Sequence, residues 1–493
     1  MFEIDRAVGL VNEGDDTRLR NVMRRAAAGE RLTVGFIGGS ITQGSLASAP
    51  ENCYAYRVYT WWRAAFPEAD FVYLNVGIGA TTSQYGAARV QTDLLIHNPD
   101  VVFVEFSVND ESNEHFLETY EGLVRQILIA GSTPAVVLIH NVCYNNGASA
   151  QLIHERVGRH YDLPCVSMQN TIYPELLSGR IQNREITPDD LHPNDAGHEL
   201  VASVITCYLE QVRSRTLAED ADEEMKEAAK KVTAEKETEE TAAKKTAKKI
   251  AEKDAAPEKT ATGRDGMGKN AVRLAAPLSL NSYERCVRVD CRSFSGGQKN
   301  PSANASGKAN TQDAKDALGT ADTLDRTDAP GAANALDATD VPSKANALGT
   351  AVAPAPAAVK KTPRDSSSAL IEADGFEPDL RAKLGITDNF KNGWTASAVG
   401  AHIVFELEGT GVSVQFCRSV NQPAPIAEIV VDQDPATRQI LDANFDETWG
   451  DKLELLTVTE HMQRGVHRIE VRLIETHADD AVPFYLNAII MAD

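Results

Sequence analysis

A serine follows two glycines in the stretch Leu32–Gly44, which reads LTVGFIGGSITQG. The apolar run at its start predicts a buried strand, and Gly38 and Gly39 predict a sharp turn directly after it. Ser40 would then stand where the strand hands over to a helix, with its hydroxyl and its backbone N–H facing the same space. A nucleophilic serine, a phosphate-binding turn and an ordinary turn all fit this stretch taken by itself.

Two further polar segments follow predicted strands. The sequence NVGIGATTS at 75–83 is a glycine-rich turn that would open a helix and present backbone N–H groups. The sequence SVND at 107–110 contains Asn109, whose side-chain amide can donate to a developing oxyanion. Close helix packing and a helix cap are the structural alternatives for these two segments.

A histidine and an aspartate lie close together near the end of the same region. In TPDDLHPNDAGH at 187–198, Asp189 stands three residues before His192 and can orient its imidazole. A surface turn is the alternative for Asp189. Taken together, however, the segments supply a nucleophile, oxyanion donors and a base at successive strand ends, which favours nucleophilic catalysis over separate structural roles.

Competing motifs fail on their spacing. Ser40 does not lie in a G-x-S-x-G elbow, because Thr42 replaces the second glycine. No lysine follows the glycines as a phosphate loop requires, and the pair Gly77 and Gly79 lacks the third glycine of a dinucleotide-binding turn.

The elements that must position these residues alternate along the chain from Leu32 to about Arg215. Short apolar runs alternate with amphipathic segments, which predicts an α/β fold with a doubly wound parallel sheet. Such sheets bind ligands beyond the carboxyl ends of their strands. The predicted strands are Leu32–Ile37, Phe71–Val76, Val101–Ser107, Ala135–Asn141 and Pro164–Met168, and the predicted helices are Thr17–Ala28, Tyr54–Phe66, Gln84–His97, Glu114–Ala130 and Ala148–Tyr161.

The composition divides the chain into three parts. Residues 1–215 form the predicted α/β domain with a helical lead-in over 1–31, and 216–276 form a charged Ala/Glu/Lys linker that is solvated and partly helical. Strand-like segments divided by Gly, Pro, Asn and Asp predict an antiparallel, jelly-roll-like β-sandwich over 277–493. A low-complexity tract at 295–368 interrupts this domain and is predicted to be disordered.

Charge and cysteine content restrict the partners. A formal net charge of −22 over 493 residues argues against nucleic acid and against an anionic membrane as partners. The start of the chain lacks the features of a signal peptide, and no apolar run is long enough to span a bilayer. The seven scattered cysteines predict reduced thiols, so we expect a cytoplasmic protein.

The segments GGSIT, NVGIGATTS, SVND and DDLHPNDAGH together resemble the four sequence blocks of the SGNH (GDSL-type) hydrolases over roughly residues 30–212. The resemblance implies that Ser40 is the nucleophile and His192 the general base. It further implies that Asp189 orients His192 and that Asn109 donates to the oxyanion, together with the N–H of Ser40. The implied reaction proceeds through an acyl-enzyme and requires no metal or organic cofactor.

The sequence departs from the family pattern at three places. Gly39 stands where the GDSL motif has aspartate, and Ser107 replaces the glycine of the G-x-N-D block. The family's oxyanion glycine corresponds to either Gly79 or Ala80, and a backbone N–H can come from either residue.

The pairing of such a hydrolase with a β-sandwich is similar to that in some carbohydrate esterases. The predicted function is therefore an acetyl esterase that acts on an acetylated carbohydrate or another small ester. A lysophospholipase or thioesterase and a catalytically inactive carbohydrate-binding protein are the alternatives. Trp394 and Trp449 fit either a sugar-stacking face or the core of the sandwich. The expected partner is a small-molecule or oligosaccharide ester, and the oligomeric state stays open.

Overall fold

The structure is a computed structural model that describes residues 2–248, 274–294 and 369–493. The low-complexity tract at 295–368 and part of the predicted linker, residues 249–273, lie outside the described residues. The described residues belong to one compact unit. Within the described ranges, no helix combines the length and the apolar character needed to cross a membrane.

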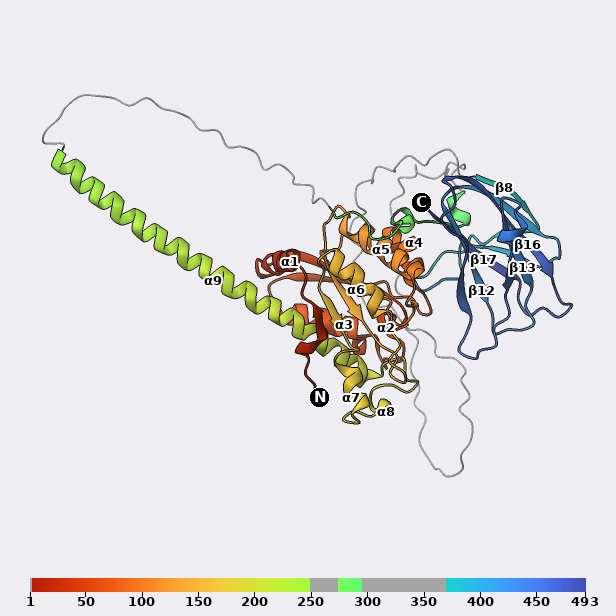
Figure 1. The fold of residues 1–493 in the computed structure, drawn as a ribbon, viewed down its shortest axis with the longest axis horizontal. Coiled ribbons are helices and arrows are strands. Elements are labelled where there is room, and N and C mark those ends of the chain that lie inside the picture. The colour runs from red at the N-terminus through yellow and green to blue at the C-terminus, as the bar shows by residue number, and fades with distance from the viewer. Residues whose placement is uncertain (1, 249–273, 295–368) are drawn as a thin grey trace, which may run out of the picture. The chain divides into compact units, whose positions relative to one another are not determined.

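A six-stranded sheet forms the centre of the α/β domain, with the strand order β1-β6-β5-β4-β2-β3. Figure 1 draws this domain in red to yellow. The five strands β2 to β6 are parallel, so the prediction of a parallel sheet is confirmed for them. Their bounds are β2 Arg31–Gly38, β3 Asp70–Asn75, β4 Val101–Glu105, β5 Ala135–His140 and β6 Cys165–Ser167. If β2 to β6 are numbered 1 to 5 in chain order, they lie across the sheet in the order 2-1-3-4-5. The direction in which the chain adds strands therefore reverses between β2 and β4, which makes this position a topological switch point.

Helices cover both faces of this sheet, which confirms the doubly wound arrangement. Helices α1 (Thr17–Ala27), α3 (Tyr54–Ala65) and α9 (Asp195–Lys248) share a core with one face, to which β2 contributes Phe36. Helices α4 (Ser83–Asp93), α5 (Glu114–Leu128) and α6 (Gln151–His160) share a core with the other face, to which β2 contributes Ile37. Neighbouring residues of a strand point to opposite faces, which explains why β2 is buried on both sides. The shorter helices are α2 (Ser40–Gln43), α7 (Ile172–Leu177), α8 (Asn183–Ile186), η1 (Ala7–Gly9), η2 (Pro50–Asn52) and η3 (Leu95–His97).

The predicted helical lead-in over 1–31 is partly wrong. It holds α1, but it also holds strand β1 (Leu10–Asn12), which pairs antiparallel with β6 and makes the sheet mixed. A strand of three residues carries too little alternation to be recognised in the sequence. Its position follows from the edge of β6, whose backbone groups need a hydrogen-bonding partner.

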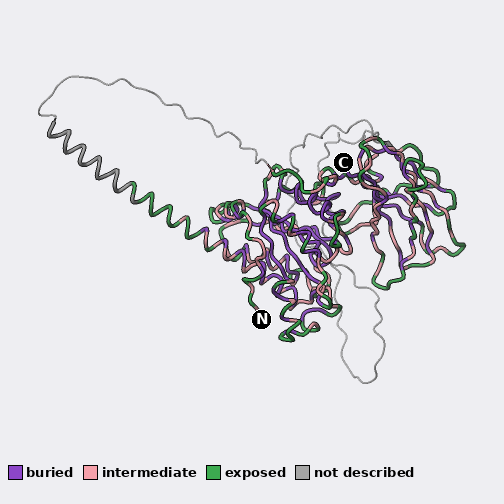
Figure 2. The backbone as a smooth tube through the Cα atoms, in the orientation of Figure 1, coloured by how far each residue is buried: buried purple, intermediate pink, exposed green. Residues whose placement is uncertain are grey.

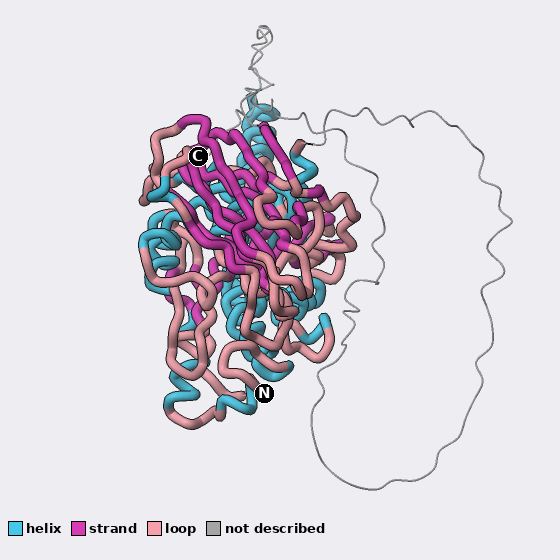
Figure 3. The backbone as a smooth tube through the Cα atoms, turned by 90° about the vertical axis from the view of Figure 1, so that its right-hand side faces the viewer, coloured by secondary structure: helices cyan, strands magenta, loops and turns pink. Residues whose placement is uncertain are grey.

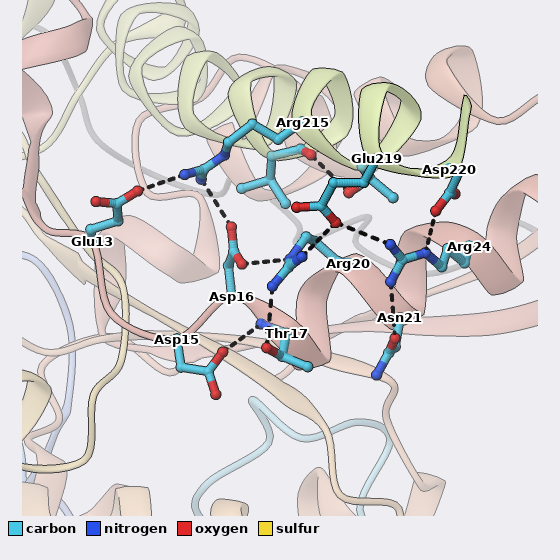
Figure 4. A network of polar contacts seen from close by, with 12 residues as sticks. Glu13, Asp15, Asp16, Thr17, Arg20, Asn21, Arg24, Arg215, Glu219 and Asp220 are labelled. Atoms are coloured by element: carbon cyan, nitrogen blue, oxygen red, sulfur yellow. Dashed lines mark hydrogen bonds and ion pairs between the residues drawn. The ribbon is translucent and has the colours of Figure 1, made fainter. Parts of the chain in front are cut away.

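Helix α9 continues past residue 216, where the linker was predicted to begin. Its buried residues extend to Thr216, and the following turns are mostly exposed, as the change from purple to green in Figure 2 shows. A network of ion pairs ties the helix at this point to α1 and to the residues before it (Figure 4). The pairs are Arg215 with Glu13 and Asp16, Arg20 with Glu219, and Arg24 with Glu219 and Asp220.

The C-terminal strands form two antiparallel sheets around a common apolar core, which confirms the predicted β-sandwich. Figure 3 shows the strands in magenta. One sheet has the order β15-β12-β17-β10-β9, with β7 paired to β17, and the other has the order β14-β13-β16-β11-β8. Trp394 lies in the core with 1% of its surface exposed, whereas Trp449 is 58% exposed. The bounds are β7 Val287–Val289, β8 Ala369–Asp374, β9 Glu377–Pro378, β10 Trp394–Ala396, β11 His402–Gly409, β12 Gly411–Arg418, β13 Ile426–Val431, β14 Gln439–Asp442, β15 Lys452–Thr459, β16 Gly465–Glu475 and β17 Phe484–Ala492. The short helix η4 (Ser282–Arg285) precedes β7, and η5 (Cys291–Ser293) and η6 (Pro435–Thr437) lie between strands.

The segment that leads into the sandwich lies on helix α5. The Glu121 carboxylate accepts the backbone N–H groups of Leu278 and Ser279, and Tyr283 is buried where a Cβ at Gly122 would collide with it. The sequence assigned this segment to the sandwich alone. An acidic residue on a predicted helix is typical of a solvated face, so the backbone partners of Glu121, 157 and 158 residues later, leave no sequence signal.

Candidate active site

Ser40 is the first residue of α2 and follows β2 after Gly39, at the topological switch point of the sheet. Ser40 is 7% exposed, and its Oγ lies 2.8 Å from Nε2 of His192. The two residues are 152 positions apart in the chain and come from opposite ends of the α/β domain. The structure therefore brings together the predicted nucleophile and the predicted base.

Asp189 holds the other side of the imidazole. Its Oδ2 lies 2.6 Å from Nδ1 of His192, while its Oδ1 accepts the backbone N–H groups of His192 at 2.7 Å and Leu191 at 3.0 Å. Partial burial acts to raise the pKa of the Asp189 carboxyl, but the hydrogen bonds from His192 and Leu191 outweigh it and lower this pKa below 3.8. Asp189 is thus an anion at neutral pH, and it fixes Nδ1 of His192 as the protonated nitrogen.

This arrangement is suited to proton transfer. With its proton on Nδ1, His192 directs the lone pair of Nε2 at the hydroxyl of Ser40. The hydroxyl donates to Nε2, so attack by Ser40 can be coupled to transfer of its proton to the histidine.

Asn109 follows β4 and lies against Gly39. A Cβ built on Gly39 would stand 2.2 Å from Oδ1 of Asn109 and 3.5 Å from its Nδ2. The amide oxygen is therefore turned toward Gly39, while Nδ2 donates to no protein acceptor in the described part of the chain. Glycine at position 39, where the family motif has aspartate, makes room for this position of the amide.

We expect the substitution Gly39→Ala to lower kcat by roughly 10- to 100-fold, because a displacement of about 1 Å at a reacting group can cost that much. The added Cβ would push the end of the Asn109 side chain rather than the backbone, so the fold should persist. Steady-state kinetics with 4-nitrophenyl acetate, alongside thermal unfolding, would check this. Unchanged kcat would show that the position of Asn109 does not matter for the reaction.

In the loop after β3, each backbone N–H from Val76 to Gly79 donates to a protein acceptor, and the series ends at Ala80. The N–H groups of residues 76 to 79 donate to Phe36 O at 2.8 Å, Asn75 Oδ1 at 2.9 Å, Gly38 O at 3.0 Å and Gln43 Oε1 at 2.5 Å, respectively. The next N–H, that of Ala80, meets no protein acceptor among the described residues. Ala80 has φ of 55°, a left-handed conformation that favours glycine.

Ser107 lies two residues after the end of β4 and binds the side chain of the last residue of that strand. Its backbone N–H and its hydroxyl both donate to Oε1 of Glu105, at 3.0 Å and 2.9 Å. Glu105 is fully buried, and burial raises the pKa of its carboxyl to about 7, against the hydrogen bonds from Ser107. The serine in place of the family's glycine thus binds a buried carboxyl that a glycine could bind only through its backbone.

Sequence reasoning missed a buried pair beside Asn109. Asp110 accepts the N–H of Ser83, the first residue of α4, at 2.9 Å, and its other oxygen lies 3.0 Å from Nε2 of His154. Burial lowers the pKa of His154 and raises that of Asp110, so the pair is a hydrogen bond with a neutral imidazole. Asp110 stands next to Asn109 in the sequence, which offers a signal, whereas nothing in the sequence marks His154.

The comparisons with known proteins agree with this site. The model of the GDSL-like lipase/acylhydrolase family matches residues 36–200. A solved structure described as a two-domain esterase (CEX) active on acetylated mannans is 43% identical, with a TM-score of 0.71, and the match covers 100% of this chain and 99% of that one. A second structure of the esterase, co-crystallised with mannopentaose, matches with the same identity, coverage and TM-score. A search of curated proteins finds no match.

The resemblance seen in the sequence blocks is therefore confirmed, and so is the prediction of an enzyme. Identity of 43% over the full chain covers the α/β domain and the β-sandwich together. The chain belongs to the GDSL-like lipase/acylhydrolase family and is a carboxylic ester hydrolase of the SGNH type.

Proposed function

We propose that this enzyme removes acetyl groups from acetylated mannans or manno-oligosaccharides through an acyl-enzyme on Ser40. The observation that carries the proposal is the chain of contacts from Ser40 Oγ to His192 Nε2 at 2.8 Å and from His192 Nδ1 to Asp189 at 2.6 Å. A full-length relative active on acetylated mannans supports the choice of substrate.

In the proposed mechanism, His192 takes the proton of Ser40 as Oγ attacks the acetyl carbonyl carbon. The histidine then passes that proton to the departing sugar hydroxyl, which leaves the acetyl group as an ester on Ser40. A water molecule attacks this ester while His192 accepts its proton, and acetate leaves as the proton returns to Ser40. Asp189 stays ionised throughout and stabilises the imidazolium.

Three donors are assigned to the oxyanion: the N–H of Ser40, the N–H of Ala80 and Nδ2 of Asn109. Within the described residues these groups have no protein acceptor, whereas the N–H of Gly79 already donates to Gln43. The left-handed φ of Ala80 also fits a position where the family has glycine. These observations favour Ala80 over Gly79, the choice that the sequence left open.

Polar side chains beside the triad suit a sugar rather than a long acyl chain. Asp190 follows the triad aspartate and holds Asn183 at 2.9 Å and Arg184 at 2.9 Å. Hydroxyl-rich ligands are recognised by such donors and acceptors, whereas long acyl chains require an apolar surface. A lysophospholipase or thioesterase is therefore the less favoured alternative.

We expect kcat/KM to be higher for acetyl than for octanoyl esters of 4-nitrophenol, because an octanoyl chain would find too little apolar surface to offset its ordering. Acetate release from acetylated manno- and xylo-oligosaccharides, measured in parallel, tests the sugar. A steady rise of kcat/KM with acyl length would overturn the acetyl assignment. Faster release from the xylo- than from the manno-oligosaccharides would overturn the mannan assignment.

A further inference from the structure

Gln43 connects the nucleophile helix to the oxyanion loop. It lies on α2, three residues after Ser40, and its Oε1 accepts the N–H of Gly79 at 2.5 Å. A Cβ built on Gly79 would stand 3.0 Å from that oxygen and 3.6 Å from Cβ of Ser40. The Gln43 side-chain amide therefore contacts Gly79, and Gly79 lies close to Ser40, which carries the reacting hydroxyl.

A second contact between the same two segments comes from Asn75. Its Nδ2 donates to the carbonyl of Thr42 at 2.7 Å, and its Oδ1 accepts the N–H of Gly77 at 2.9 Å. Asn75 thus anchors the start of the loop on α2, and Gln43 anchors it again two residues later. Beyond Gly79, the Thr81 hydroxyl donates within the loop to the carbonyl of Ile78 at 2.7 Å, and Asp110 accepts the N–H of Ser83.

The residue directly after the Gln43 contact is strained. Ala80 has φ of 55°, in the left-handed region, where the Cβ of an L-residue lies too close to the following carbonyl oxygen. Such a conformation persists only where neighbouring contacts impose it. Two contacts flank Ala80: the Thr81 hydroxyl closes the loop on Ile78, and the hydrogen bond from Gly79 to Gln43 fixes the peptide unit immediately before Ala80 to helix α2.

We propose that Gln43 is a positioning residue of the oxyanion hole: by holding the N–H of Gly79, it keeps the N–H of Ala80 directed at the oxyanion. The inference rests on the proposed assignment of Ala80 as a donor. Within the described residues, Gln43 makes no hydrogen bond to Ser40, His192 or Asp189. It acts through the loop, by making one N–H unavailable and the next one available.

The opposite role for Gln43 is a plug. Its carbonyl oxygen would then occupy the Gly79 N–H in place of the substrate and would have to leave before the reaction. The two roles predict changes of opposite sign. Loss of a positioning residue lowers kcat, whereas loss of a plug raises kcat/KM.

The test is the substitution Gln43→Met, which keeps the length of the side chain and removes the acceptor. We expect kcat with 4-nitrophenyl acetate to fall roughly 10-fold, less than the 10²- to 10³-fold cost of losing a whole oxyanion donor, while KM stays within about twofold. Gln91→Met, at an exposed glutamine on α4, is the matched control and should leave both constants unchanged. A rise in kcat/KM, or no change, in Gln43→Met would overturn the proposal.

A second variant separates positioning from a general loss of structure. Ala80→Gly keeps the backbone N–H and removes the strain at position 80, so we expect kcat of the double variant Gln43→Met/Ala80→Gly to exceed kcat of Gln43→Met by about threefold or more. A merely structural defect would not respond in this way, and absence of rescue would contradict the proposal. If Ser40→Ala keeps its activity, the proposed function fails. If Ser40→Ala is inactive but Gln43→Met is fully active, only the inference on Gln43 fails.

Discussion

The substitution Ser40→Ala is expected to abolish ester hydrolysis, with kcat reduced at least about 10⁴-fold, because the variant can form no acyl-enzyme. The hydroxyl makes one hydrogen bond, to His192, so its removal should cost the free energy of unfolding only about 1 kcal/mol. The protein should therefore remain folded. Initial rates with 4-nitrophenyl acetate and a thermal unfolding curve measure the two effects separately.

Ser48→Ala provides a matched control. Ser48 is an exposed-site serine in the same region, and it donates through its N–H and its hydroxyl to Asp195 rather than to the triad. We expect this variant to keep wild-type activity. If Ser40→Ala retained turnover within tenfold of the wild type, the assignment of the nucleophile would be wrong.

The substitution Asn109→Ala is expected to lower kcat by roughly 10²- to 10³-fold with little change in KM, the usual cost of one oxyanion donor. The reason is that, in the proposed mechanism, Nδ2 of Asn109 stabilises negative charge that develops only in the transition state. Among the described residues, its Oδ1 is buried without a hydrogen-bond partner, so truncation leaves no donor there unpaired. Steady-state kinetics at saturating substrate measure the loss.

Asn109→Asp distinguishes donation from space filling. The aspartate keeps the shape of the side chain beside Gly39 but places a carboxylate where the amide donates, so kcat should fall below that of Asn109→Ala. Asn21→Ala, on the exposed face of α1, serves as the control and should be fully active. An active Asn109→Asp would show that the side chain only fills the space beside Gly39.

Much of the fold could be predicted because its signals are local. The apolar run of β2, the glycines after it and the amphipathic period of α3 lie within a few residues of the features they determine. Alternation of strands and helices then places the ends of β2 and β4 at one edge of the sheet. That is why Ser40 and Asn109 could be expected near each other before any distance was known.

The remaining features depend on partners that are distant in the sequence. Strand β1 needs the edge of β6, and the segment before the sandwich needs the buried carboxylate of Glu121. The choice between Gly79 and Ala80 as oxyanion donor requires the acceptor of every N–H in the loop to be known, including the N–H of Gly79, which donates to Gln43. A sequence pattern records none of these contacts, because each is made between residues that are far apart along the chain.

The most direct test of the central claim is the mass of the acyl-enzyme. Rapid acid quenching after mixing with excess 4-nitrophenyl acetate, followed by proteolysis and mass spectrometry, should show one additional acetyl group on the peptide that contains Ser40. The acetyl group should appear within the first turnover and be absent from Ser40→Ala. Turnover without acetylation of this peptide, or acetylation of another residue on the catalytic timescale, would contradict the account.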